Sequence, residues 1–319
     1  MDILLVTDHN FIMPTVIAMK SVCISNQKEY ITFHVIIDET VNKVDVDSIK
    51  KINESNEGKV SLKLYPINSG GIDLNIFPQI GKTHHSKATY YRILVCNILP
   101  PELKKVLYID SDVIVRKNIS ELWNIDIEGY AVACVPDANE DNREILKRLN
   151  IDYKLGYFNA GIAYINLEYW RLNNIQNRLL TFIKEKSDLI KFVDQDVLNA
   201  VLKSEKKFLP LKYNVQTGFL LKPKYLKIDL KKYKDQLTEA VSDPYIIHFI
   251  GPKPWSPDCH NPYKVYFKNV QDMTEWKDVR MVKGEKYVKA VIRKYLREIL
   301  ICLGLYENKL IDVKLNDNR

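Results

Sequence analysis

The chain has 319 residues, of which 46% are hydrophobic and 27% charged, and its formal net charge is +7. These proportions are those of an ordinary soluble protein that can bury a large core. No apolar run approaches the roughly 18 residues that span a bilayer. Met1 leads directly into an apolar run, so we expect no signal peptide. The five scattered cysteines suit a reducing cytoplasm and favour neither disulfides nor a zinc site.

Apolar runs alternate with segments of helical spacing along most of the chain. The runs predict strands at Ile3–Thr7, Phe33–Asp38, Val60–Ile67, Val106–Asp110, Ala131–Val135, Gly161–Leu167 and Tyr245–Ile250. The spacing predicts helices at Thr15–Ser25, Val44–Asn53, Lys87–Leu99, Asn177–Lys186 and Gln195–Leu202. This order predicts an α/β fold with a mostly parallel sheet covered by helices on both faces. In such sheets ligands bind beyond the carboxyl ends of the strands.

Two carboxylates, Asp110 and Asp112, follow one apolar run at a spacing of two residues. Side chains at this spacing in an extended chain point the same way, so both can converge on one ligand. Oxygen ligands of this kind suit Mg²⁺ or Mn²⁺, commonly with substrate phosphates. The alternative is a strand end with two solvated aspartates.

A histidine after another apolar run strengthens the prediction of a metal site. His248 could add a neutral imidazole to the two carboxylates, although a lone histidine after a strand is often only part of the core. Gly251 allows close backbone approach to a ligand, and Lys253 supplies a charge suited to a diphosphate. The nearby glycine and lysine favour the metal interpretation.

Two further segments carry polar residues next to predicted elements. Asn159-Ala160-Gly161 begins a predicted strand with small residues that would let a sugar or phosphate approach the backbone. The alternative is a plain turn. Asp194 and Gln195 precede a helical pattern. Asp194 suits an N-cap, whereas a neighbouring glutamine suits recognition of a hydroxyl group.

The last part of the chain leaves the alternation of strands and helices. Basic and apolar residues interleave at helical spacing from Lys283 to Tyr306. We therefore divide the chain into a catalytic domain, 1–265, and a basic amphipathic extension, 266–319. Such a helix is typical of an interfacial membrane anchor. The alternative is a helix packed on the catalytic domain with a solvated basic face. No motif for nucleic-acid binding accompanies the mild positive charge.

Six segments, taken in order, resemble glycosyltransferase family 8, which includes glycogenin and bacterial lipopolysaccharide galactosyl- and glucosyltransferases. They are Thr7-Asp8-His9-Asn10, Thr89-Tyr90-Tyr91-Arg92, Leu107-Tyr108-Ile109-Asp110-Ser111-Asp112, Phe158-Asn159-Ala160-Gly161, Asp194-Gln195-Asp196 and His248-Phe249-Ile250-Gly251-Pro252-Lys253-Pro254-Trp255. The resemblance spans residues 1–260. It implies a glycosyltransferase-A fold, a UDP-sugar donor and retention of anomeric configuration.

The resemblance also implies roles for single residues. The implied metal ligands for Mn²⁺, with Mg²⁺ as a second option, are Asp110, Asp112 and His248. The implied catalytic residues are Asp194, Gln195 and Asp110. The implied donor-binding residues are Thr7, Asp8 and Asn10 at the uridine, Arg92 and Ser111, then Asn159, Ala160 and Gly161 at the sugar, and Gly251 with Lys253 at the diphosphate. Asp137 falls near an acceptor-side aspartate of some members.

Two positions depart from the family pattern. Phe11 stands where many members have tyrosine, and only Pro252 separates Gly251 from Lys253 where many members have two residues. For retention we favour front-face attack by the acceptor hydroxyl. A double displacement needs a carboxylate nucleophile, and Asp194 is the one residue that we can name for it.

The predicted function is metal-dependent transfer of a hexose, glucose or galactose, to a saccharide acceptor such as lipopolysaccharide or another cell-surface glycan. Family members with aromatic and basic tails act on lipid-linked acceptors. We therefore expect a cytoplasmic enzyme bound peripherally, through the C-terminal helix, to the anionic inner face of the cell membrane. The alternatives are a haloacid-dehalogenase-like phosphatase, because Asp110-x-Asp112 follows an apolar run, and a non-catalytic nucleotide-sugar-binding protein.

Overall fold

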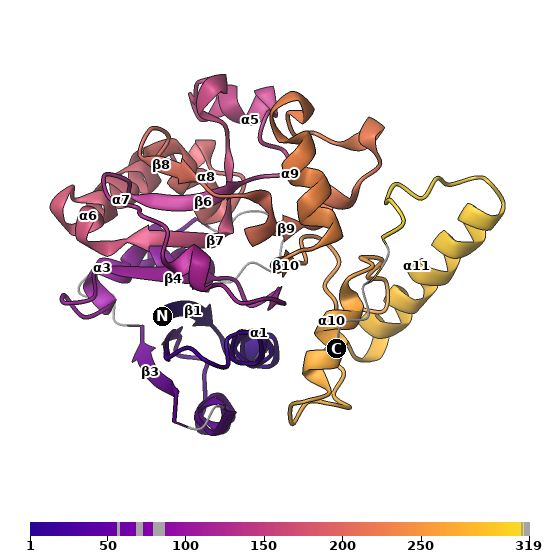
Figure 1. The fold of residues 1–319 in the computed structure, drawn as a ribbon, viewed down its shortest axis with the longest axis horizontal. Helices are drawn as coiled ribbons and strands as arrows, with labels where there is room; N and C mark the ends of the chain where they lie inside the picture. The colour runs from indigo at the N-terminus through magenta and orange to yellow at the C-terminus, as the bar shows by residue number, and fades with distance from the viewer. Residues whose placement is uncertain (56–57, 68–72, 79–86, 314, 316–319) are drawn as a thin grey trace.

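The computed structural model describes residues 1–55, 58–67, 73–78, 87–313 and 315. Within these residues, a seven-stranded sheet runs in the order β3-β2-β1-β4-β7-β6-β8 through the centre of the molecule (Figure 1). Its strands are β1 (Asp2–Thr7), β2 (Ile31–Ile37), β3 (Val60–Pro66), β4 (Lys105–Ile109), β6 (Val132–Pro136), β7 (Phe158–Asn166) and β8 (Lys206–Phe208).

The sheet is mostly parallel, as the sequence predicted. Strand β1 pairs in parallel with β2 and β4, β2 with β3, and β6 with β8. Strand β7 is the exception, because it runs antiparallel to both β4 and β6. The register between β6 and β7 shifts at Cys134 and Val135, opposite Asn159. Such an irregularity re-aims side chains and is frequent beside active sites.

A smaller sheet lies next to the carboxyl end of β4. Among the described residues it has three strands in the order β5-β10-β9, with bounds β5 (Val113–Val115), β9 (Val215–Gln216) and β10 (Ile246–His248). The antiparallel pairing of β10 with β5 places His248 opposite Val113. Consequently His248 lies beside the turn that carries Asp112, although the two residues are far apart in the chain. The sequence did not predict β5 or β9.

Helices cover both faces of the large sheet, which confirms the predicted architecture. The α-helices of the described residues are α1 (Ile12–Ser25), α2 (Lys43–Lys50), α3 (Val95–Ile98), α4 (Ser120–Trp123), α5 (Arg143–Arg148), α6 (Leu167–Leu172), α7 (Ile175–Glu185), α8 (Val193–Val201), α9 (Leu230–Ser242), α10 (Lys264–Gln271) and α11 (Gly284–Cys302), of which α11 lies apart from the sheet. Ile3 and Leu5 of β1 join a core with α1, α9 and α10, whereas Leu4 joins one with α6, α7 and α8. This alternation follows the two-residue period of a strand.

One predicted helix has a different form in the structure. The segment predicted at Lys87–Leu99 is a 3-10 helix over Lys87–Leu94, continued by the short α3. The tighter 3-10 turn places residues three apart on the same face. Tyr91, Arg92, Ile93 and Leu94 are nevertheless all buried.

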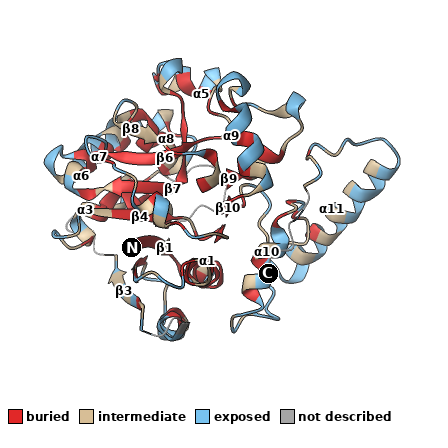
Figure 2. Ribbon diagram, viewed as in Figure 1, coloured by how far each residue is buried: buried red, intermediate tan, exposed pale blue. Residues whose placement is uncertain are grey.

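The C-terminal helix α11 projects beside the main body of the molecule and is largely exposed (Figures 1 and 2). Ala290 is its one buried residue. After the helix the chain returns to the body, where Leu310 is buried and forms an antiparallel bridge with Leu221. No helix in the described part of the chain combines the length and apolarity needed to cross a membrane. The division of the chain at residue 265 stays a prediction, and residues 314 and 316–319 of that extension lie outside the described residues.

Candidate active site

Two aspartates and one histidine meet at the carboxyl end of β4. One ligand atom from each of Asp110, Asp112 and His248 lies within 4.8 Å of the others. The His248 Nε2 atom is 3.3 Å from Asp112 Oδ1 and 3.7 Å from Asp110 Oδ2. Strand β4 ends at Ile109, so both aspartates lie in the turn that leads into β5. This turn brings the carboxylates together, so they converge as predicted, but through a turn and not through the extended strand that the sequence argument assumed.

The surroundings of this cluster fit a divalent cation. Asn214 Oδ1 lies 3.0 Å from His248 Nδ1, which directs the other ring nitrogen, Nε2, toward the carboxylates. Gly161 packs directly against the cluster, because a Cβ atom there would lie 2.2 Å from His248 Cε1 and 2.7 Å from Asp110 Oδ2. Only glycine leaves this space open. Two carboxylates with one imidazole are a donor set that suits Mn²⁺ or Mg²⁺.

Lys253 reaches the same cluster from the loop after β10. Its Nζ atom donates to Asp112 Oδ2 and, at 3.1 Å, to the Phe249 carbonyl oxygen. Burial by itself would raise the pKa of Asp112, but the neighbouring Lys253 and His248 hold this pKa well below its ordinary value. Gly251 in this loop has a φ of +91°, a left-handed conformation that favours glycine. Asp112 is therefore ionised over the whole physiological range.

Arg92 connects the metal-ligand cluster to the next part of the site. Its Nη2 atom donates to Asp110 Oδ1 at 2.8 Å, and its Nη1 atom donates to the Ala160 carbonyl at 2.7 Å. The guanidinium lies 3.8 Å above the centre of the Tyr108 ring. Arg92 is only 4% exposed. It is thus a buried cation that orients Asp110, and its contact with the donor sugar or diphosphate stays a prediction.

Asp194 lies on the other side of Arg92. Its Oδ2 atom is 2.9 Å from Arg92 Nε, but that nitrogen donates its hydrogen bond to the Thr89 carbonyl at 3.3 Å. Within the described residues, this buried oxygen consequently has an ionic partner and no hydrogen-bond donor. Burial raises the pKa of Asp194 to about 7, against the opposing effect of Arg92. Asp194 is thus a buried acceptor next to Arg92 that accepts no hydrogen bond at Oδ2 from the described residues.

Gln195 belongs to a buried polar network. Its Oε1 atom accepts hydrogen bonds from Asn159 Nδ2 at 3.1 Å and from the Ala160 amide at 3.0 Å. Its Nε2 atom donates to Asp137 Oδ2 at 3.2 Å, and Asn159 Nδ2 donates to the same oxygen at 3.1 Å. The network joins β7, α8 and the loop after β6. Predicted sugar and acceptor residues are therefore brought together.

The interpretation of Asp194 as an N-cap is wrong. The N-cap of α8 is Phe192, and Asp194 is the second residue inside the helix. Asp196 accepts hydrogen bonds from the backbone amides of Lys191 and Phe192 instead. The sequence pattern could not distinguish these two carboxylates, because which one faces the preceding backbone depends on the local backbone angles.

The predicted uridine residues lie at the carboxyl end of β1. The Asp8 carboxylate accepts from the Asn10 amide at 2.9 Å, which shapes the turn, and Asn10 is exposed. Thr15 Oγ1 lies 2.9 Å from Thr7 Oγ1 and 2.8 Å from Ser111 Oγ. These buried hydroxyls join α1 to the turn of Asp110 and Asp112. The side chains of Thr7 and Ser111 thus support the site from within.

Sequence reasoning missed two residues that support the cluster. Asn214 and Gln216 are fully buried. Asn214 donates to Asn159 Oδ1 at 2.9 Å, and Gln216 donates to the Pro136 carbonyl at 2.8 Å while accepting from the Ala138 amide. The alternation of polar and apolar residues at 214–216 is the one signal in the sequence that could have indicated a short strand here.

A mostly parallel sheet with an Asp-x-Asp turn at its carboxyl edge is the arrangement of glycosyltransferases with the A-type fold. The sequence model of glycosyl transferase family 8 matches residues 2–259, and the chain belongs to this family. The six motifs identified in the sequence lie within the matched residues. The predicted family is therefore confirmed.

Relatives and solved structures agree with this assignment. General stress protein A of Bacillus subtilis is 35% identical over 72% of this chain and 82% of its own. A lipopolysaccharide 1,2-glucosyltransferase of Escherichia coli is 29% identical over 85% of this chain and 77% of its own. The crystal structure of the galactosyltransferase LgtC with donor and acceptor sugar analogs superposes with a TM-score of 0.76, covering 91% of this chain and all of that one, at 24% identity. This last similarity confirms the fold.

Proposed function

We propose that the protein transfers a hexose, glucose or galactose, from a UDP-sugar to a saccharide acceptor with retention of anomeric configuration. The observation that carries this proposal is the cluster of Asp110, Asp112 and His248 around the space that Gly161 leaves open. Relatives named as lipopolysaccharide glucosyl- and galactosyltransferases support a hexose and a cell-surface glycan acceptor. The family match favours a transferase over the phosphatase that the Asp-x-Asp run also allowed.

The same cluster would hold Mn²⁺, or Mg²⁺ as a second option. Held by Asp110, Asp112 and His248, such a cation would neutralise charge that develops on the departing diphosphate. Lys253 lies on the adjoining loop and can turn its ammonium group from Asp112 toward the phosphates. Gly251 allows that loop to approach them closely because its backbone is left-handed.

The donor would lie along the carboxyl edge of the sheet. Uridine would bind the turn at Asp8 and Asn10, beyond β1. The sugar would reach Asp194, whose buried oxygen can accept a hydrogen bond from a hydroxyl group. The sugar would lie against Asn159 and Gln195, which are hydrogen-bonded to each other.

Front-face attack fits these residues better than a double displacement. The bond from the anomeric carbon to the UDP oxygen breaks, and the acceptor hydroxyl oxygen bonds to that carbon on the same face. The hydroxyl proton passes to the departing β-phosphate. A double displacement would need a free carboxylate beneath the sugar. Asp194 is held by Arg92 at 2.9 Å, and the Gln195 amide is a poor nucleophile.

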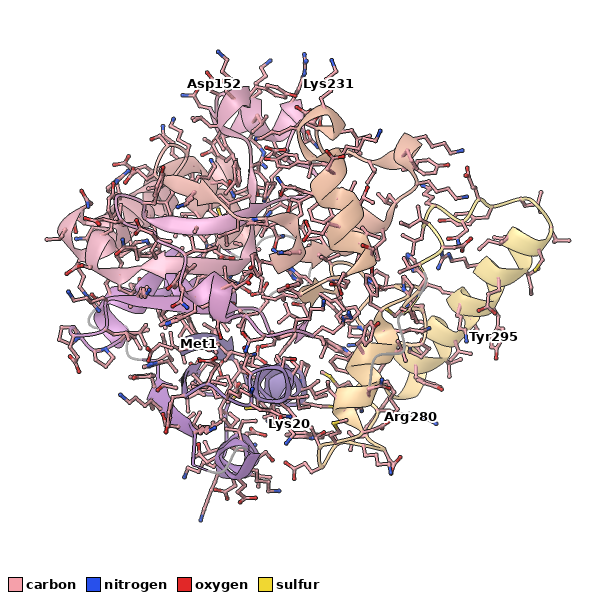
Figure 3. The ribbon with its side chains drawn as sticks, viewed as in Figure 1. Met1, Lys20, Asp152, Lys231, Arg280 and Tyr295 are labelled. Atoms are coloured by element: carbon pink, nitrogen blue, oxygen red, sulfur yellow. The ribbon has the colours of Figure 1, made fainter. Side chains whose placement is uncertain are left out.

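We further propose that α11 attaches the enzyme to the inner face of the cell membrane. The helix presents an exposed apolar face that includes Val288, Ile292, Tyr295, Leu296 and Ile299 and is continued by the exposed C-cap residue Leu303. Tyr295, labelled in Figure 3, lies on α11 at the margin of the molecule. The buried Ala290 marks the opposite side, toward the body. An apolar face turned to solvent is a feature of interfacial helices and is unexpected in a helix packed on its own domain.

The basic residues of α11 have a smaller part in this attachment than their number suggests. Arg293 pairs with Asp258 on the body, at 2.7 Å. Lys289 and Lys294 pair with glutamates within the helix. Each basic residue near an anionic membrane contributes roughly 1 kcal/mol. We therefore expect the apolar face to supply most of the attraction.

One experiment tests the proposed reaction. The purified protein is incubated with Mn²⁺, Mg²⁺ or EDTA and with a panel of UDP-sugars, and UDP release is followed with and without a glycan acceptor. We expect metal-dependent release from UDP-glucose or UDP-galactose and a product of retained configuration by NMR. Binding of donors without turnover would indicate the non-catalytic alternative. Hydrolysis of aryl phosphates without turnover of any UDP-sugar would indicate the phosphatase.

A further inference from the structure

The backbone just before Asp194 has an unusual conformation. Val193 has a φ of +47°, which lies in the left-handed region. A β-branched residue there is strained, because its side chain crowds the backbone. Such strain persists only where the surrounding structure holds it in place. Val193 separates the N-cap of α8, Phe192, from the two residues that face the sugar site.

The carboxylate of Asp196 accounts for much of that restraint. It is fully buried and accepts five hydrogen bonds. Oδ2 accepts from the backbone amides of Lys191 at 2.7 Å and Phe192 at 2.8 Å, and from Arg148 Nη1 at 2.8 Å. Oδ1 accepts from Tyr157 Oη at 2.8 Å and from Arg148 Nη2 at 3.3 Å. The two amides immediately precede Val193, so the carboxylate fixes the chain on that side.

Asn199 fixes the chain on the other side of Val193. Its Nδ2 atom donates to the Gln195 carbonyl at 2.9 Å and to the Phe158 carbonyl at 2.8 Å. Its Oδ1 atom accepts from the Phe158 amide at 2.8 Å. The first turn of α8 is thereby attached to β7 at the residue preceding Asn159. With both flanks held, the left-handed turn determines where Asp194 and Gln195 point.

We propose that Asp196 is a positioning residue for the transfer reaction. Its carboxylate holds the left-handed backbone at Val193 and so directs Asp194 to Arg92 and Gln195 to Asn159. It does not act on the sugar itself, because it is buried and its five donors surround both oxygens. The negative charge matters, since charge-assisted hydrogen bonds to backbone amides are stronger than neutral ones and Arg148 compensates the burial. This inference rests on the proposed function.

The first test replaces Asp196 by asparagine, which keeps the shape and removes the charge. The side-chain NH₂ group of asparagine would also face groups that donate hydrogen bonds to the carboxylate in the wild type, and two donors cannot bond to each other. We expect kcat for transfer to fall about 100-fold, as a displacement of about 1 Å can produce. The Kd for UDP with Mn²⁺ should change less than about twofold, because the proposed UDP contacts lie beyond β1, at the Asp110, Asp112 and His248 cluster and on the loop after β10, and none of them is on α8. Asp188→Asn, an exposed neighbour, is the matched control. An unchanged kcat in the folded variant, or weakened UDP binding in parallel with kcat, would overturn the proposal.

Rescue at Val193 separates positioning from general stability. Glycine adopts a positive φ without strain. Val193→Gly in the Asp196→Asn background should therefore recover part of the lost kcat. If Asp196→Asn does not fold, Tyr157→Phe removes one of the five hydrogen bonds and should lower kcat by a smaller factor with UDP binding retained. Equal losses of kcat and UDP affinity in Tyr157→Phe, or no recovery with glycine, contradict a positioning role.

Hydrogen exchange gives a measurement that does not depend on the reaction. Backbone amides at residues 191–196 should exchange faster in Asp196→Asn than in the wild type or in Asp188→Asn. If the wild type releases UDP from no sugar donor, the proposed function fails while this measurement still tests the restraint. Unchanged exchange at these amides would show that Asp196 does not hold the turn.

Discussion

Arg92 and Asp194 form a buried ion pair in which Nε and Oδ2 are 2.9 Å apart without a hydrogen bond between them. The same guanidinium holds Asp110, one of the three residues of the metal-ligand cluster. A single buried cation therefore contacts both the Asp110, Asp112 and His248 cluster and the carboxylate of Asp194, for which we propose a role at the donor sugar. The dependence of the enzyme on pH follows from this relationship.

Transfer should increase with pH through about 7. Burial raises the pKa of Asp194 to about 7, and only the ionised form carries the charge that pairs with Arg92. We expect Asp194→Asn to lower kcat/KM and to flatten this rise. The measurement is the pH profile of kcat/KM for both proteins between pH 5.5 and about 8.5. An equally steep rise in the variant would show that another group titrates.

The same shift has a consequence for stability. A carboxyl group whose pKa is higher in the folded protein than in the unfolded chain binds more protons in the folded protein. Its contribution to the free energy of unfolding is therefore complete below the pKa of the unfolded chain, about 3.9. This contribution is lost as the pH rises through the folded pKa of about 7. The melting temperature of Asp194→Asn minus that of the wild type should accordingly become more positive from pH 5 to pH 8. A constant difference would contradict the raised pKa.

Replacing Asp112 by asparagine should abolish metal-dependent donor binding. Asp112 contacts His248 and Lys253. These two neighbours hold the pKa of Asp112 well below its ordinary value, so its carboxylate keeps its negative charge. We expect transfer to fall by about 10² to 10³-fold, the effect of losing one stabiliser of developing charge. Calorimetry of UDP with and without Mn²⁺ measures the loss, with the exposed Asp235→Asn as control. Normal Mn²⁺-dependent UDP affinity in Asp112→Asn would exclude the metal site proposed here.

Gly161→Ala should damage the cluster through space alone. The added methyl group would lie 2.2 Å from His248 Cε1, so the imidazole must move away from the carboxylates. We expect Mn²⁺-dependent UDP binding to be lost. Gly129→Ala is the matched control, because its φ of +75° makes alanine strained while no atom lies within 4 Å of the new Cβ. It should lower the melting temperature and leave metal-dependent binding intact. Retained binding in Gly161→Ala would mean that the cluster tolerates displacement of His248.

Charged substitutions on the exposed face of α11 should release the enzyme from membranes. Ile292→Glu combined with Ile299→Glu places two carboxylates on that face. We expect sedimentation with phosphatidylserine-containing vesicles to be lost and UDP-sugar hydrolysis to continue. The control is Val44→Glu with Leu172→Glu, two exposed apolar residues elsewhere. Point substitutions are preferable to truncation, because Leu310 beyond the helix is buried against the body. Undiminished vesicle binding would assign α11 another partner.

The types of element and the family were determined by the sequence itself. Every predicted strand has a counterpart, such as β1 for Ile3–Thr7 and β3 for Val60–Ile67, because two-residue and 3.6-residue periodicities are local properties. The Asp-x-Asp spacing predicted that two carboxylates converge, and they do. The six motifs, taken in order, were sufficient for the family.

Tertiary structure decided how the elements meet. The antiparallel direction of β7 and the pairing of β10 with β5, which places His248 beside Asp112, join segments far apart in the chain, so no local pattern encodes them. The buried position of Arg92 and the left-handed Val193 likewise depend on which distant donors and acceptors surround them. Even the helical pattern of α11 left open which face would turn outward. That choice depends on the packing of Ala290 against the body and not on the periodicity of the helix.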